Sequence, residues 1–209
     1  MSSPTADTPP SGHGAPTARR PLRADARRNR DKLVAAARDA LTSEEGADSL
    51  EAVARRAGVG IGTLYRHFPT RESLMEAVYG AELDSLVADA ATLLENQPPE
   101  TALREWAASY ARFTATKRGM TDALRRGVGD GRVPATTTRE RITAAITPIL
   151  AAGAETGALR DDVAPEDVTT LLLGTFLAAT ASDSPEATPR LLDLVVDALR
   201  PRPASSATR

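Results

Sequence analysis

The chain contains no cysteine, and aromatic residues make up only 3% of its 209 residues. Without cysteine, neither a disulfide nor a thiolate metal site can form, and a reducing cytosol is permitted. The chain also lacks the alternation of β-branched and aromatic residues that is typical of strands, whereas alanine, a strong helix former, is abundant. The sequence therefore predicts an all-α protein.

Long apolar runs are missing as well. No stretch approaches the roughly 18 apolar residues that are needed to cross a bilayer. The N-terminal residues also lack the apolar core of a signal peptide. We therefore expect a soluble, cytoplasmic protein that has no membrane partner.

Side chains that commonly carry catalysis are scarce. The only histidines are His13 and His67, and no cysteine is available as a nucleophile or ligand. Transition-metal catalysis and Cys–His chemistry therefore lack their residues. Adjacent acids such as Asp161 and Asp162 fall in expected loops or helix ends, where solvated capping is their expected role. We expect no enzymatic activity, no metal and no cofactor.

Residues 49–71 are the most informative stretch, and their pattern predicts two short helices joined by a turn. Ser49 is suited to cap the first helix, because its hydroxyl can accept a hydrogen bond from an unpaired backbone N–H. Apolar residues recur at helical spacing on both sides of Gly58, which tolerates the positive φ of a tight turn. Pro69 ends the second helix. This helix-turn-helix would place its second helix in the major groove of DNA.

Basic residues gather around this stretch, although the formal net charge of the chain is −2. Residues 19–71 hold 12 Lys and Arg against 7 Asp and Glu, and the remaining residues hold 14 against 21. Positive charge is therefore concentrated where attraction to DNA phosphates requires it. Solvation of helix faces is the alternative role for these arginines, but their coincidence with the motif favours DNA binding.

The run AGVGIGTLYRHFPTRESL, residues 57–74, resembles the DNA-binding signature of the TetR family of transcriptional regulators. A segment SLEAVA, residues 49–54, precedes it at the usual distance. The resemblance implies a three-helix DNA-binding domain that contains the helix-turn-helix, followed by a helical domain for ligand binding and dimerisation. It also implies a homodimer that forms through the last two helices.

Ten residues are expected to contact DNA: Arg27, Arg28, Ser49, Ile61, Gly62, Thr63, Tyr65, Arg66, His67 and Arg71. Most of them would fix the position of the protein on the phosphate backbone, while Ile61 and Arg66 are the candidates for base readout. Ile61 offers only apolar contact, for instance to a thymine methyl, so specificity is expected to depend on Arg66, Tyr65 and DNA shape. His67 is either a phosphate contact or part of the helix packing.

We expect four segments along the chain. Residues 1–22 form a disordered tail, whose basic end either enters a minor groove or has no role. Residues 23–70, with a first helix from about Ala24 to Thr42, form the DNA-binding domain. Residues 71–200 form a regulatory and dimerisation domain, and residues 201–209 a second disordered tail. The last two helices carry apolar residues on more than one face, which favours an intersubunit four-helix bundle over a monomeric core.

An effector site, if one exists, is expected in the second domain and lined by Trp106, Tyr110, Phe113, Met120, Ile146 and Phe176. None of these side chains is charged, so we expect a small, mainly apolar ligand. A plain hydrophobic core is the alternative interpretation of this stripe.

Three functions remain open. The first is a dimeric repressor that a ligand releases from a double-stranded, pseudo-palindromic operator. The second is a DNA-binding protein without an effector, which predicts a closed and filled second domain. The third is a helical interaction adaptor that keeps the fold but has lost DNA binding.

Overall fold

The computed structural model describes residues 19–42, 49–120, 135–181 and 186–201. These residues form helices and no strand, which confirms the predicted all-α fold. The helices are α1 (Arg19–Thr42), α2 (Leu50–Arg56), α3 (Ile61–His67), α4 (Arg71–Asn96), α5 (Pro99–Gly119), α7 (Ala135–Glu155), α8 (Pro165–Ala181) and α9 (Ala187–Ala198). None of them has the length and apolarity that a membrane span needs.

Helix α1 begins at Arg19, earlier than the start expected near Ala24. Pro21 does not prevent this, because proline is tolerated in the first turn of a helix, where its missing N–H would be unpaired in any case. Most of the two expected tails, residues 1–18 and 202–209, lies outside the described residues.

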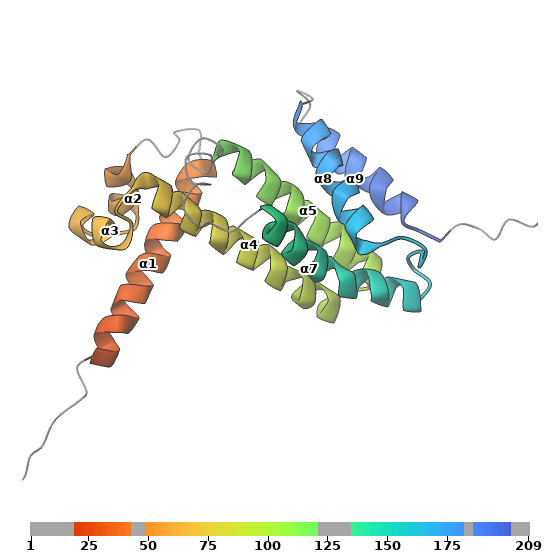
Figure 1. Ribbon diagram of the computed structural model, residues 1–209, viewed down its shortest axis with the longest axis horizontal. Coiled ribbons are helices and arrows are strands. Elements are labelled where there is room, and N and C mark those ends of the chain that lie inside the picture. Colours follow the sequence, from red (N-terminus) through yellow and green to blue (C-terminus); the bar gives the residue numbers. More distant parts are fainter. Residues whose placement is uncertain (1–18, 43–48, 121–134, 182–185, 202–209) are drawn as a thin grey trace, which may run out of the picture.

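The helices are arranged as a head and a body, which α4 connects (Figure 1). Helices α1, α2 and α3 form the head around the first turns of α4. The remaining length of α4 packs along α5 and α7, and α8 and α9 complete the body. Helix α4 therefore belongs to both parts of the molecule.

Each part has its own hydrophobic core. The head cluster contains buried Leu33, Val53 and Leu64, together with Leu74 and Val78 from α4. The body cluster is built around the aromatic and aliphatic side chains Trp106, Tyr110, Phe113, Ile146, Ile149, Leu172 and Phe176. Tyr79, on α4, packs against both clusters, so it lies at their junction.

Local interactions fix the start and position of α4. The hydroxyl of Thr70, the N-cap of α4, accepts from the backbone N–H of Ser73 at 3.1 Å. Ser73 returns the contact by accepting from the N–H of Thr70 at 3.3 Å, which completes a capping box. An ion pair of 3.0 Å between Arg38 and Glu82 then ties α1 to α4. The head is thereby attached to the connecting helix at more than one point.

Candidate nucleic-acid interface and ligand cavity

The turn between α2 and α3 has the geometry that the sequence predicts. Ser49 caps α2, and its Oγ accepts from the backbone N–H of Ala52 at 3.1 Å. Gly58 has a φ of 67°, in the region that side chains disfavour, so the chain can turn directly after α2. The N–H of Val59 donates to the carbonyl of Ala54 at 3.0 Å and closes the turn. The predicted helix-turn-helix is confirmed.

Helix α3 is anchored on one side and open on the other. Leu64 is fully buried in the head core. On the opposite side the side chains of Ile61 and Tyr65 are 38% and 46% exposed, and Gly62 and Arg66 are exposed as well. Thr63 and His67 are half-buried at the edges of this face. The open face of α3 is therefore composed of residues that were predicted from the sequence to contact DNA.

Basic residues of neighbouring helices surround this face. The guanidinium of Arg30, on α1, lies 5.3 Å from the ring centroid of buried Phe68, just after α3. Such a cation–π contact helps hold α1 against the helix-turn-helix. Arg27 and Arg28 are exposed on the same helix, where Arg28 pairs with Asp25. Arg71 is exposed at the start of α4, so three of the predicted phosphate contacts are accessible to solvent.

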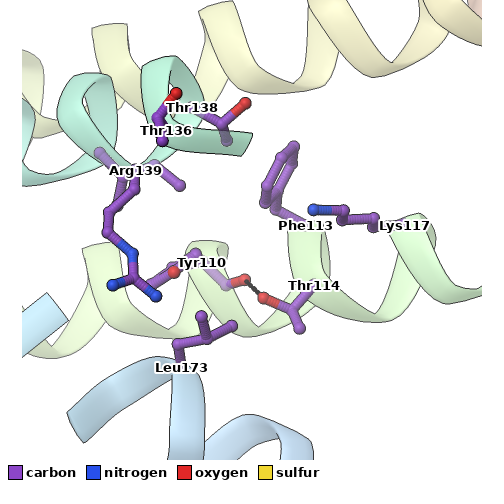
Figure 2. A pocket seen from close by; sticks show the side chains of 9 residues that line it. Tyr110, Phe113, Thr114, Lys117, Thr136, Thr138, Arg139 and Leu173 are labelled. Atoms are coloured by element: carbon purple, nitrogen blue, oxygen red, sulfur yellow. Dashed lines mark hydrogen bonds between the residues drawn. The ribbon is translucent and has the colours of Figure 1, made fainter. Parts of the chain in front are cut away.

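The body contains a cavity of about 330 Å³ between α5, α7 and α8 (Figure 2). Its lining residues are Tyr110, Phe113, Thr114, Lys117, Thr136, Thr138, Arg139, Ile142 and Leu173. This volume lies at the lower end of the range that small-molecule sites occupy. Aromatic and aliphatic walls with a few polar groups are also typical of such sites.

The polar groups of the cavity come from both sides. Figure 2 shows Arg139 extending from α7 towards Tyr110 and Leu173, while Lys117 points its ammonium towards Phe113. Burial raises the pKa of Tyr110 to about 12; nearby Arg139 acts in the opposite direction, and Tyr79 adds to the increase. The phenol is therefore neutral at physiological pH and can both donate and accept a hydrogen bond.

The cavity is joined to the head through α4 and α5. The hydroxyls of Tyr79, on α4, and Thr138, in the cavity wall, lie 3.0 Å apart and share a hydrogen bond. The Tyr79 ring also packs against Phe113 with a centroid distance of 5.4 Å. The Nζ of Lys117 lies 5.6 Å from the centroid of the Tyr79 ring. At the end of α5, Met120 is buried in the head cluster.

Two further hollows are of similar size but have different linings. One, of about 370 Å³, lies between α4 and α5 and is lined by Asp89, Glu105 and Arg112 among others. The other, of about 400 Å³, lies beside Arg160, whose guanidinium is already held by Asp162 at 2.5 and 2.7 Å. Neither has aromatic walls, so we favour the cavity between α5, α7 and α8 as the ligand site, although it is not the largest.

Two family models match the chain, one in each part. Residues 33–78 match the model for bacterial regulatory proteins of the tetR family. Residues 98–201 match the model for the C-terminal domain of SbtR-like transcriptional regulators. Between them they cover most of the head and most of the body.

Solved structures extend the similarity to nearly the full chain. The crystal structure of the TetR transcriptional regulator SCO0520 from Streptomyces coelicolor is 41% identical, with a TM-score of 0.73 over 83% of this chain and 99% of that one. The chain belongs to the TetR family. A TetR transcription regulatory protein from Mycobacterium vanbaalenii is 34% identical, with a TM-score of 0.69 over 87% of this chain and 100% of its own.

A curated relative is similar over part of the chain. The HTH-type transcriptional repressor KstR from Mycolicibacterium smegmatis is 37% identical over 81 residues. This match covers 37% of the present chain and 40% of that repressor. The similarity therefore covers well under half of either chain.

Within this TetR-family fold, the ten residues predicted to contact DNA lie on the head or at the start of α4. Ser49 keeps a hydroxyl hydrogen to donate, because its oxygen is the acceptor in the cap. The half-buried position of His67, whose ring centroid lies 6.3 Å from that of Phe68, is compatible with both roles considered for it. The DNA contacts themselves remain predictions.

The predicted effector residues are distributed differently from the expectation. Of the six, only Tyr110 and Phe113 line the cavity. Trp106, Ile146 and Phe176 are fully buried in the body core. Met120 belongs to the head core, because α5 continues to Gly119 and carries it out of the body. The alternative interpretation as plain core therefore applies to four of the six residues.

The cavity also contains charge that the sequence analysis did not assign to it. Lys117 and Arg139 both line it, contrary to the expectation of an uncharged set. Lys117 follows Tyr110, Phe113 and Thr114 at helical spacing, so extending the stripe of α5 by one turn would have identified it. Arg139 and the threonines of α7 gave no comparable signal, because their position depends on how α7 crosses α5.

Proposed function

We propose that this chain is a transcriptional repressor that binds a palindromic operator as a homodimer and is released when a small molecule occupies the cavity between α5, α7 and α8. The observation that carries this proposal is the placement of the cavity. Its walls belong to α5 and α7, and the same helices reach the head through Met120 and the Tyr79–Thr138 hydrogen bond. The protein would act in the bacterial cytoplasm, where its operator DNA lies.

On DNA, α3 would lie in the major groove, with the first turns of α1, α2 and α4 on the flanking phosphates. Ser49 and Arg71, at the starts of α2 and α4, would position the head on the backbone, assisted by Thr63, Tyr65 and His67. Base readout would fall to Ile61 and Arg66. Because Gly60 and Gly62 flank Ile61 and present no side chain, DNA shape would contribute to specificity.

A homodimer would form through α8 and α9. Helix α8 exposes an apolar stripe that consists of Leu171, Gly174, Leu177 and Ala178. Leu171 and Leu177 are 48% and 49% exposed, and Leu194 on α9 is 60% exposed. Apolar patches of this kind mark protein–protein interfaces. A two-fold axis would also match the symmetry of a palindromic operator.

Release would follow from a ligand that binds one arrangement of the helices better than another. A molecule in the cavity contacts α5 and α7 at residues whose neighbours are Tyr79 and Met120. A shift of α4 or α5 would therefore move each head relative to the dimer axis. The separation of the two α3 helices would then no longer match the operator.

Of the alternatives, a DNA-binding protein without an effector predicts a filled second domain, and the cavity between α5, α7 and α8 disfavours it. An adaptor without DNA binding has no need for exposed Tyr65 and Arg66 beside a basic α1. Both observations favour the repressor.

Capture of genomic DNA tests the proposed function. Fragments bound by the purified protein are sequenced, and capture is repeated with candidate small molecules. We expect a palindromic motif whose half-sites are about one DNA turn, or a small multiple of it, apart, and we expect its recovery to fall with an active compound. Fragments without a shared motif, or recovery that no compound changes, would contradict the proposal.

Tyr79→Phe should uncouple the cavity from the head while preserving both. The ring keeps its packing against Phe113, but the hydrogen bond to Thr138 is lost. One intramolecular hydrogen bond is worth about 0.5–1.5 kcal/mol, so we expect the ligand-induced loss of operator affinity to shrink about two- to tenfold. The measurement compares operator binding with and without a compound that releases the wild-type protein.

Thr147→Val is the matched control, because the Thr147 hydroxyl bonds only within α7, to the carbonyl of Thr143 at 2.8 Å. We expect normal release from this variant. If Tyr79→Phe also released normally, the hydrogen bond to Thr138 would have no part in the coupling.

A further inference from the structure

The lining of the cavity has a charge of one sign. Among the described residues it contains two cations, Lys117 from α5 and Arg139 from α7, and no carboxylate. Two other arginines of the body form ion pairs: Arg141, two residues beyond Arg139, binds Asp84 at 2.7 Å, and Arg104 pairs with Asp193. The wall of the cavity therefore brings two cations together, with no carboxylate among its described lining residues.

The rest of the lining is apolar or neutral. Phe113, Ile142 and Leu173 present aromatic and aliphatic surface to the cavity. The Tyr110 phenol remains protonated, because its pKa is raised to about 12. Together with the hydroxyls of Thr136 and Thr138, it supplies neutral groups that can donate to an anion without repelling it.

The positions of Lys117 and Arg139 determine which of them would hold an anionic ligand directly. The Lys117 ammonium already lies over the Tyr79 ring, at 5.6 Å from its centroid. The Arg139 guanidinium extends into the cavity towards Tyr110 (Figure 2). A guanidinium can bind a carboxylate through two parallel hydrogen bonds, which gives both affinity and orientation.

We propose that the cavity binds a small organic carboxylate, with its carboxylate held by Arg139 beside Tyr110, its apolar body against Phe113, Ile142 and Leu173, and Lys117 as the second positive charge. This replaces the mainly apolar ligand expected from the sequence. The inference specifies the ligand class of the site on which the proposed function rests, but binding can be measured without DNA.

The test uses matched compounds that share a body and differ in charge. Octanoate, octanamide and octylamine form one set, and 4-phenylbutyrate with its amide forms a second. Binding to the full-length protein is measured by calorimetry and by the fluorescence of Trp106, the only tryptophan, whose ring centroid lies 5.6 Å from that of Tyr110. We expect each carboxylate to bind at least about tenfold more tightly than its amide, because hydrogen bonds to charged groups are the stronger ones. The amine should bind most weakly.

Arg139→Gln should remove the preference of the acid over the amide, with a loss of about ten- to a hundredfold in carboxylate affinity and little change for the amide. Arg139 is exposed, so the variant should fold normally. Arg141→Gln, on the same helix but outside the cavity, is the matched control and should keep the preference. Leu173→Trp, which fills the cavity from α8, should weaken acid and amide alike.

Amides that bind as tightly as the acids, acids that do not bind, or a preference that survives Arg139→Gln would each overturn the ligand class. The proposed function is tested separately by adding the same carboxylates to the operator complex. Binding without release would leave the ligand class standing and contradict the release mechanism. If only a neutral compound released the operator, the release mechanism would stand and the ligand class would be contradicted.

Discussion

Replacing both Tyr65 and Arg66 by alanine is expected to abolish operator binding and leave the fold intact. Both side chains lie on the open face of α3, outside the head core that Leu64 anchors. A good side-chain contact to a base, as proposed for Arg66, is worth about 1–3 kcal/mol. The backbone contact of Tyr65 adds to this, and a dimer makes each contact twice. We therefore expect affinity to fall by at least about a thousandfold, measured by fluorescence anisotropy on a captured operator fragment.

The stability of the same variant should change by no more than about 0.5 kcal/mol, because exposed side chains contribute little to folding. Thermal unfolding followed by circular dichroism measures this. Arg112→Ala, an exposed arginine on α5 in the body, is the control for loss of charge alone. If the double variant still bound the operator, with an affinity that falls steeply with salt, α3 would not be the recognition helix.

The head was predictable because its signals are local. A capping serine, a glycine where φ is 67° and a proline after the second helix each act within a few residues of the turn that they determine. Exposure of the α3 face then followed from helical periodicity, since Leu64 is the residue that packs inwards. The first turn of α1 was missed, because Pro21 was assigned to a flexible tail.

The cavity was not predictable in the same way. Aromatic residues at helical spacing on α5 are equally compatible with a filled core and with a site. Which side chain meets a void depends on how α5, α7 and α8 cross, and these crossings depend on contacts far apart in the sequence. Thus Trp106 fills the core, while Tyr110, one turn later, also faces the cavity.

Met120 shows how the length of one helix changes a residue's role. Helix α5 continues to Gly119, and Met120 follows it directly. At a rise of 1.5 Å per residue, Met120 lies roughly 10 Å beyond Phe113 along the helix. This distance takes it from the cavity region into the head core. A predicted ligand contact is therefore, in the structure, a contact between the two parts of the molecule.

The second large effect concerns dimerisation. Replacing Leu171 and Leu177 by glutamate should separate the dimer, because both lie on the exposed apolar stripe of α8. In a dimer of this variant, the two stripes would bury four carboxylates between them, two from each protomer, with no group to neutralise them. The single chain should still fold, since both positions are about half exposed in it. We expect the dissociation constant of the dimer to rise by at least about a hundredfold.

Analytical ultracentrifugation over a range of protein concentrations measures this shift, and operator binding by the same samples should fall in parallel. The control places the same charges elsewhere: Ala144→Glu with Ala151→Glu, two exposed positions on one face of α7. That variant should remain dimeric at concentrations where the α8 variant is monomeric. A dimer that survives glutamate at Leu171 and Leu177 would have to use another surface, and the spacing of the two α3 helices would then be set by a different pair of elements.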